Sequence, residues 1–154
     1  MKRSIDRIAK VLLESTGEGI YGVDLEGDCI FLNRAGAKVL GLEPEAVLGK
    51  SMHAVIHHSH ADGRPYPADE CPINRVLRSG QGGRVDSEVF WRPDGTCFPA
   101  EYSSFPIIDD GFVAGAVVTF ADITGRREAE AERVAQIRIA EMEAETGAAV
   151  VESL

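Results

Sequence analysis

The residues best suited to chemistry lie close together between positions 53 and 71. All four histidines of the chain fall there, and an aspartate and a cysteine follow them. Imidazole, carboxylate and thiolate are ligands that zinc and iron accept, so the segment predicts a candidate metal site, although its spacing is irregular. His53 begins the group, and the ligands that we expect are His57, His58, His60, Asp62 and Cys71.

Two other interpretations of these residues stay open. The histidines can be loop residues, with Asp62 and Gly63 in a turn and Cys71 as a small buried apolar side chain. They can also sense pH, because histidine changes its charge near neutrality. A haem would need an axial ligand on the helix expected at 69–80, and that segment has no histidine.

The rest of the sequence offers no grouping that predicts catalysis. It has no glycine-rich phosphate loop, no nucleophile beside a patterned base and no paired core carboxylates. The cysteines, Cys29, Cys71 and Cys97, form no CxxC pair, which argues against a disulfide framework. We therefore expect a protein that is not an enzyme.

Composition narrows the class of protein further. A chain of 154 residues with 44% hydrophobic content supports one compact domain with helical extensions. The net charge of −9 argues against a nucleic-acid partner. No apolar run approaches the roughly 20 residues of a membrane span, and residues 1–10 do not resemble a signal peptide. We expect a cytoplasmic protein without a membrane segment.

The element that must position the candidate residues is the uncharged run 112–120. Its length predicts a strand in the middle of a sheet, with Ala116, Val118 and Phe120 on one face. Further strands are expected at 20–25 and 29–32 and in a hairpin over 84–105. Because residues of helical character follow Asp122, this central strand should run directly into an exit helix.

The hairpin over 84–105 has a turn at 92–95 that predicts its register. Val89 then lies opposite Phe98, and Trp91 shares the inner face of the sheet with them. The outer face would carry Glu88, Phe90 and Phe105, among others.

Helices are expected at both ends of the chain and between the strands. The first helix has an apolar stripe, which indicates a covered or dimeric surface. Asn33 can cap a short helix, Asp69 can cap another that ends near Gly80, and the segment 52–72 is expected to be a loop. The exit helix has a weaker stripe, typical of a short coiled-coil linker. The predicted dimer residues are Ile5, Ile8, Leu12, Leu13, Phe90 and Phe105.

Four blocks of sequence resemble a known family when they are taken in order. They read GEGIYGVDLEG (17–27), FLNRAGAKVLG (31–41), RPDGTCFPAEY (92–102) and GAVVTFADITGRR (115–127). The chain is similar to the PAS (Per-ARNT-Sim) sensory domains of bacterial signalling proteins. The resemblance implies an α+β fold with a five-stranded antiparallel sheet in the order 2-1-5-4-3 and short helices on one face. It divides the chain into an N-terminal helix (1–14), a PAS domain (15–127) and a C-terminal signalling helix (128–154).

The resemblance also implies a function, which is a sensory input domain. Such a domain binds a small ligand or cofactor, forms a homodimer and relays a signal to a C-terminal output module such as a kinase, cyclase, phosphatase or transcription factor. The alternatives are a PAS module used only for protein association and a metal or haem sensor built on 53–71. The implied relay residues are Asp122, Ile123 and Thr124. The implied ligand pocket consists of Met52, Ile56, Trp91, Phe98, Ala100, Tyr102, Val118 and Phe120.

The light-sensing flavin branch of the family matches this sequence poorly. Its reactive cysteine would fall in the segment 49–52, which reads Gly-Lys-Ser-Met. The Asn and Gln that hold the flavin ring would fall near Ala100 and Phe120, whose side chains make no hydrogen bonds. A flavin photocycle is therefore not expected, and the cofactor stays unidentified.

Overall fold

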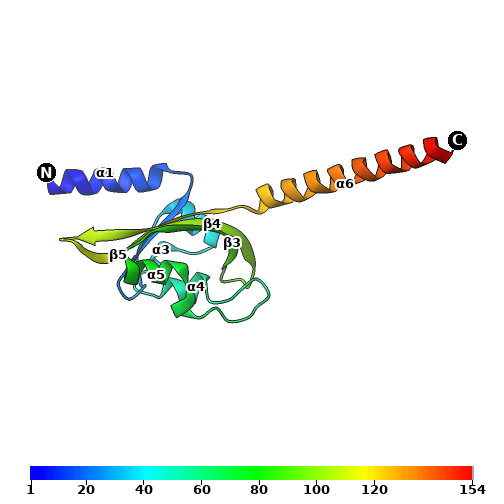
Figure 1. Ribbon diagram of the computed structural model, residues 1–154. Coiled ribbons are helices and arrows are strands. Elements are labelled where there is room, and N and C mark those ends of the chain that lie inside the picture. The colour runs from blue at the N-terminus through cyan, green and yellow to red at the C-terminus, as the bar shows by residue number, and fades with distance from the viewer. Residues whose placement is uncertain (154) are drawn as a thin grey trace. The chain divides into compact units, whose positions relative to one another are not determined.

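The computed structural model describes residues 1–153, and the chain folds as two units that meet between Asp122 and Ile123. The first unit contains an antiparallel five-stranded sheet in the order β2-β1-β5-β4-β3, which confirms the predicted topology (Figure 1). The long central strand β5 pairs with β1 on one side and β4 on the other. The strands are β1 (Gly19–Asp24), β2 (Cys29–Leu32), β3 (Gly83–Trp91), β4 (Cys97–Asp109) and β5 (Phe112–Asp122).

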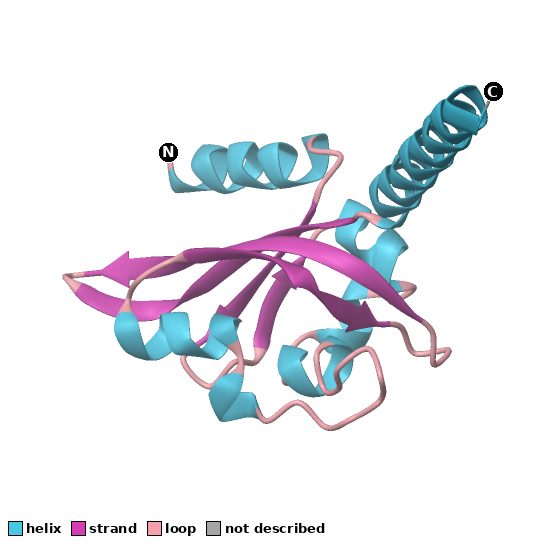
Figure 2. Cartoon of the chain, turned by 45° about the vertical axis from the view of Figure 1, so that its right-hand side comes forward, coloured by secondary structure: helices cyan, strands magenta, loops and turns pink. Residues whose placement is uncertain are grey.

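Short helices pack on one face of this sheet (Figure 2). α5 contacts β4 and β5, and α2 contacts β1, so the core lies between these helices and the sheet. The helices of the first unit are α1 (Lys2–Ser15), α2 (Arg34–Leu40), α3 (Pro44–Val47), α4 (Met52–Ile56) and α5 (Pro72–Ser79), with a 3₁₀ turn at Ala68–Glu70.

Asn33 begins α2 and also ties three segments together. Its Oδ1 accepts hydrogen bonds from the backbone N–H of Gly36 and of Ile20. Its Nδ2 donates to the carbonyls of Leu13 and Glu18. The predicted cap is confirmed, and this buried amide joins the end of α1 to the start of β1.

The inner face of the sheet is aromatic. As predicted, Phe120 on β5 is buried, and its ring centroid lies 5.5 Å from that of Phe90 and 5.8 Å from that of Tyr21. A Cβ built at Gly19 would lie 2.4 Å from the Phe120 ring. The missing side chain of Gly19 is thus what makes room for this ring.

The hairpin between β3 and β4 differs from the predicted register by one residue. Phe90, not Val89, pairs with Phe98, because the connection spans five residues and closes with a bond from the Arg92 N–H to the Thr96 carbonyl. A one-residue slip exchanges the two faces of a strand. Phe90 is consequently 0% exposed, so its assignment to a dimer surface was wrong.

Two further residues change face with this register. Trp91 is half-buried instead of lying in the core, and its indole N–H donates to the Ser59 carbonyl at 2.9 Å. The same register places Glu88 opposite buried Ala100, and a bulge between Val85 and Glu88 ends this register. Glu88 therefore points to the inner side of the sheet, contrary to our prediction.

The segment 52–72 is more ordered than the expected loop. α4 forms there because the Ser51 hydroxyl accepts a hydrogen bond from the Ala54 N–H, which caps the helix. Asp69 lies in the 3₁₀ turn and does not cap α5. That helix begins instead with Pro72, whose fixed φ suits a first helical position.

The second unit is a single long helix, α6 (Thr124–Ser153). It begins four residues earlier than the boundary at 128 that we predicted, directly after the last strand. Val134, Ile139 and Met142 are exposed along it. Among the residues described, no helix is long and apolar enough to cross a membrane.

Candidate functional site

A row of three polar side chains crosses the core beneath the sheet. The His57 Nδ1 lies 3.3 Å from the Cys71 Sγ, and the His57 Nε2 lies 2.9 Å from the Glu88 Oε1. The three residues come from three places, namely the C-terminal end of α4, the residue before α5 and the middle of β3. His57 and Cys71 are each 1% exposed. The fold thus buries a thiol, an imidazole and a carboxylate in one hydrogen-bonded line.

The carboxylate of Glu88 accepts hydrogen bonds from three side chains. In addition to His57, the Tyr66 hydroxyl donates to its Oε2 at 2.7 Å, and the Tyr102 hydroxyl donates to its Oε1 at 2.5 Å. Tyr102 is 1% exposed, so its hydroxyl needs this acceptor. Three donors on one carboxylate are the arrangement that stabilises its charged form.

The protonation of the three groups is shifted by these contacts. Burial raises the pKa of Glu88, but the bonds from His57, Tyr102 and Tyr66 outweigh it and lower that pKa to about 2. Burial lowers the pKa of His57, but Cys71 and Glu88 outweigh it and raise that pKa to about 9. Burial raises the pKa of Cys71, yet the imidazoles of His53 and His57 lower it to about 6. The cluster therefore favours a thiolate beside an imidazolium.

His53 completes the cluster from the first turn of α4. Its Nε2 lies 2.7 Å from the Tyr66 carbonyl, which can only accept, so this nitrogen carries the proton. Its Nδ1 is buried and has no hydrogen-bond partner among the described residues.

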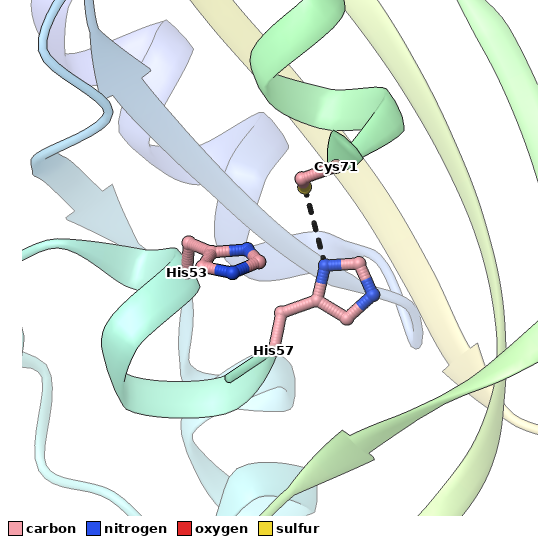
Figure 3. A group of neighbouring side chains, drawn as sticks. All are labelled: His53, His57 and Cys71. Atoms are coloured by element: carbon pink, nitrogen blue, oxygen red, sulfur yellow. Dashed lines mark hydrogen bonds between the residues drawn. The ribbon is translucent and has the colours of Figure 1, made fainter. Parts of the chain in front are cut away.

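The structure brings together only part of the predicted metal ligands. One donor atom from each of His53, His57 and Cys71 lies within 4.8 Å of the others, and Figure 3 shows the three side chains facing one another. Of the expected set, His57 and Cys71 belong to this group.

The other three expected ligands lie elsewhere. His58 is exposed, its ring stacks on Trp91, and its Nδ1 contacts the Ser59 hydroxyl. His60 stacks on the ring of Tyr66 at 4.3 Å. Asp62 accepts a bond from the Arg64 side chain. These contacts match the interpretation of His58, His60 and Asp62 as structural residues of the 57–66 loop.

The residues expected to line a ligand pocket form the core. All of them except the half-buried Trp91 are buried. A small cavity of about 10 Å³ lies beside the polar cluster and is lined in part by Tyr21, Met52 and Cys71. This is space for about one water molecule. A flavin ring would also meet the apolar side chains of Ala100 and Phe120, so the residues present do not fit that cofactor.

Thiol, imidazole and carboxylate in this order are also the parts of a cysteine nucleophile and its base. No local pattern indicates this pairing, because Cys71 and His57 are 14 residues apart in the chain. Both are almost fully buried, so a substrate has no access to the sulfur in this structure. This burial does not suit acyl transfer at the Cys71 sulfur.

The predicted relay residues lie at the end of β5. Asp122 is its last residue, and its Oδ2 lies 3.4 Å from an Nη of Arg92. Arg92 also donates from Nε to the Val39 carbonyl and lies over the Phe98 ring at 4.6 Å. Ile123 is buried, and Thr124 begins α6.

Sequence reasoning left His53 out of the expected ligand set and missed Glu88 and Arg92 as partners. The spacing of four between His53 and His57 would have placed them on one helical face, had Ser51 been recognised as a helix cap. Glu88 could not be found without the actual register of the β3–β4 hairpin. For Arg92 the sequence carries no signal, since Asp122 is 30 residues away.

Comparisons with known proteins agree with the fold. A family model described as the PAS domain matches residues 17–125. The blue light receptor lreA of Aspergillus flavus is 34% identical over 70 residues, which are 46% of this chain. The matched region spans only 7% of that receptor.

Solved structures of similar fold come from several signalling proteins. An RNA-binding light-oxygen-voltage receptor has a TM-score of 0.68 at 18% identity, over 92% of this chain and 40% of that chain. A PAS domain from Colwellia psychrerythraea has a TM-score of 0.63 at 19% identity, over 79% and 98% of the two chains. A PAS domain from a two-component sensor histidine kinase has a TM-score of 0.60 at 13% identity, over 79% and 99%. With the family model matching most of its length, this chain belongs to the PAS domain family.

Proposed function

We propose that this chain is the sensory input module of a longer signal-transduction protein and that it is not itself a catalyst. A change in its core is passed along β5 into α6 and from there to an output module. Membership of the PAS family supports this role, as does the likeness to a PAS domain of a sensor histidine kinase.

The observation that carries the proposal is the course of β5. Ala116, Val118 and Phe120 alternate into the core from this strand. Two residues after Phe120 the strand ends at Asp122, and α6 begins at Thr124. Because β5 and α6 are consecutive parts of one chain, a displacement of the core side chains is transmitted to α6 without any other element. A signal requires only that the input favours one of two arrangements of this strand.

Arg92 gives the end of β5 a second connection to the core. It links Asp122 to the β3–β4 connection, to α2 through Val39 and to the buried Phe98 ring. Asp122 is 30% exposed and Arg92 27%, so their ion pair is partly shielded from water. A displacement of the β3–β4 hairpin therefore changes how firmly Arg92 holds Asp122, the last residue of β5.

Asp122→Ala is expected to alter output without unfolding the domain. In a fusion of this chain to a histidine kinase, loss of the Arg92 contact should change the ratio of active to inactive kinase by about 5- to 150-fold, the usual range of coupling between sites. The measurement is autophosphorylation of the fusion, with circular dichroism of the isolated variant as the check on folding.

The matched control is Asp109→Ala, an exposed carboxylate at the opposite end of the β4–β5 pair. It should leave the kinase ratio unchanged. If Asp122→Ala leaves the ratio at the wild-type value as well, the strand end has no part in the relay.

Self-association is a second part of the proposal, and α1 favours it. Ile5, Ile8 and Leu12 are 59%, 59% and 63% exposed on one side of this helix. Apolar side chains at this spacing form a stripe that a second copy of the helix can cover. Phe105 is 53% exposed on the sheet and adds to the apolar surface, whereas Phe90 does not.

We expect the chain to sediment as a dimer and the dimer to weaken when residues 1–14 are deleted. Ile8→Glu with Leu12→Glu should have the same effect, because two charges would be buried at the interface. Ile30→Glu, at an exposed apolar residue on β2, is the control and should not change the sedimentation coefficient. A monomeric wild-type chain at high micromolar concentration would refute the dimer.

A further inference from the structure

The cluster of His53, His57 and Cys71 resembles a metal site whose histidines are already held in place by hydrogen bonds to the protein. Each histidine uses its Nε2 for a bond to the protein, to Glu88 from His57 and to the Tyr66 carbonyl from His53. Such partners fix the ring and the tautomer of a metal-bound histidine and raise its basicity. The Nδ1 of His53 has no hydrogen-bond partner among the described residues, whereas the Nδ1 of His57 bonds to the Cys71 Sγ. A metal ion bound here would replace the proton that His57 and Cys71 share, and that proton would pass to solvent.

The distances between the donor atoms suit one small ion. In a tetrahedral zinc site, a nitrogen and a sulfur ligand are about 3.5 Å apart, as follows from bond lengths of about 2.0 and 2.3 Å. The His57 Nδ1 and Cys71 Sγ are 3.3 Å apart, and all three donors lie within 4.8 Å of one another. The 4.8 Å limit exceeds the tetrahedral spacing by only about 1 Å, so a small adjustment of these side chains would close the site. The buried Nδ1 of His53 has no other partner among the described residues.

We propose that His53 Nδ1, His57 Nδ1 and Cys71 Sγ bind a single Zn²⁺ ion. The cavity of about 10 Å³ next to Cys71 leaves a water-sized space for a fourth ligand. Two imidazoles and one thiolate suit zinc, and they exclude calcium and magnesium, which take oxygen ligands. His58, His60 and Asp62 are not part of the site, because their side chains are engaged elsewhere.

The site joins elements that the PAS fold holds separately. His53 and His57 belong to α4 and its end, Cys71 precedes α5, and Glu88 connects His57 to β3 and, through the Tyr102 hydroxyl, to β4. An ion held by all three side chains therefore ties α4 to the start of α5. The Zn²⁺ ion would be the input of the sensor proposed above. Its effect on output rests on that proposal, whereas its binding to the three side chains does not.

The test uses the whole 154-residue chain, freed of metal with a chelator and titrated with Co²⁺ as a spectroscopic substitute for Zn²⁺. We expect one ion per chain, the strong visible absorption of tetrahedral Co²⁺ and a thiolate-to-metal charge-transfer band, all removed when Zn²⁺ is added. Cys71→Ser should abolish the charge-transfer band. His53→Ala should weaken binding at least about tenfold, and Zn²⁺ should raise the melting temperature of the wild type but not of this variant.

Matched controls come from the same chain. Cys97→Ser removes a half-buried thiol and His60→Ala a neighbouring imidazole, and both should bind as the wild type does. A charge-transfer band that survives Cys71→Ser, or unchanged affinity in His53→Ala, would overturn the assignment. If Cys71→Ser does not fold by circular dichroism, His53→Ala decides, since His53 is only half-buried.

Two further experiments test which ion binds and whether it is the input of the sensor. Retention of Cu⁺ in the presence of excess Zn²⁺ under reducing conditions would assign the site to copper and overturn zinc, because a thiolate also favours Cu⁺. Zn²⁺ binding that leaves the kinase fusion unchanged would refute the ion as the input while the site itself stands. The Asp122→Ala comparison tests the relay independently of any metal.

Discussion

Replacing Phe120 by alanine is expected to lower the free energy of unfolding by about 3 to 5 kcal/mol, the usual cost of removing a buried phenylalanine ring. Phe120 is 2% exposed and packs on Phe90 and Tyr21. The ring also fills the space that Gly19 and Gly36 leave open, where an added Cβ would come within 3.1 Å of it. Backbone surrounds this part of the ring, so the cavity cannot collapse easily after the change.

The measurement is urea unfolding in the presence of a chelator, followed by the fluorescence of the single tryptophan. Phe112→Ala on the same strand is the matched control, because Phe112 is 78% exposed and its loss should change stability by less than about 0.5 kcal/mol. A loss below about 1 kcal/mol for Phe120→Ala would contradict its place in the core.

Local patterns were sufficient to predict most of the fold. The uncharged run that became β5, the glycine turns and the Asn33 cap each specify one element, whereas the strand order was implied by the resemblance to the PAS family. Patterns of this kind depend on neighbouring residues, which a sequence shows directly. The inward side chains of β5 were therefore predicted correctly from its pattern, and the strand order that the resemblance implied is confirmed.

The β3–β4 hairpin shows where such patterns are insufficient. The sequence from Arg92 to Gly95 indicates a turn, but the residue after it, Thr96, also belongs to the connection. One additional residue reverses the two faces of β3, and the bulge before Glu88 reverses the strand again. The register of the hairpin depends on which side chains of β3 fit into the core. Phe90 fits beneath the sheet, where its ring stacks on Tyr102.

The candidate site was predicted in composition but not in geometry. Histidines and a cysteine between positions 53 and 71 suggested a metal, yet the set that the fold brings together differs from the expected one. The difference arises because α4 turns His53 and His57 inward, while Trp91 and Tyr66 engage His58 and His60 through their rings. These contacts join residues far apart in the chain, so no local pattern contains them.

Glu88→Ala is expected to destabilise the domain by about 3 to 5 kcal/mol, which is the cost of removing one partner from a buried ion pair. The carboxylate is 19% exposed and accepts bonds from His57, Tyr66 and Tyr102. The alanine variant leaves all three donors without their acceptor inside the core. Each buried group that loses its partner costs about 1 to 3 kcal/mol, so the loss should exceed that of any single hydrogen bond.

A double-mutant cycle with Tyr102→Phe separates this effect from a simple loss of packing. In the wild type, Tyr102→Phe removes one hydroxyl and its bond to Glu88, and we expect a cost of about 1 kcal/mol. In the Glu88→Ala background the same change removes a buried hydroxyl that has lost this acceptor, so it should cost nothing or restore stability. Asp109→Ala, at an exposed position of β4, is the control and should change stability by less than about 0.5 kcal/mol. Equal costs of Tyr102→Phe in both backgrounds would show that Glu88 and Tyr102 are not coupled, and the carboxylate would then not be the centre of the cluster.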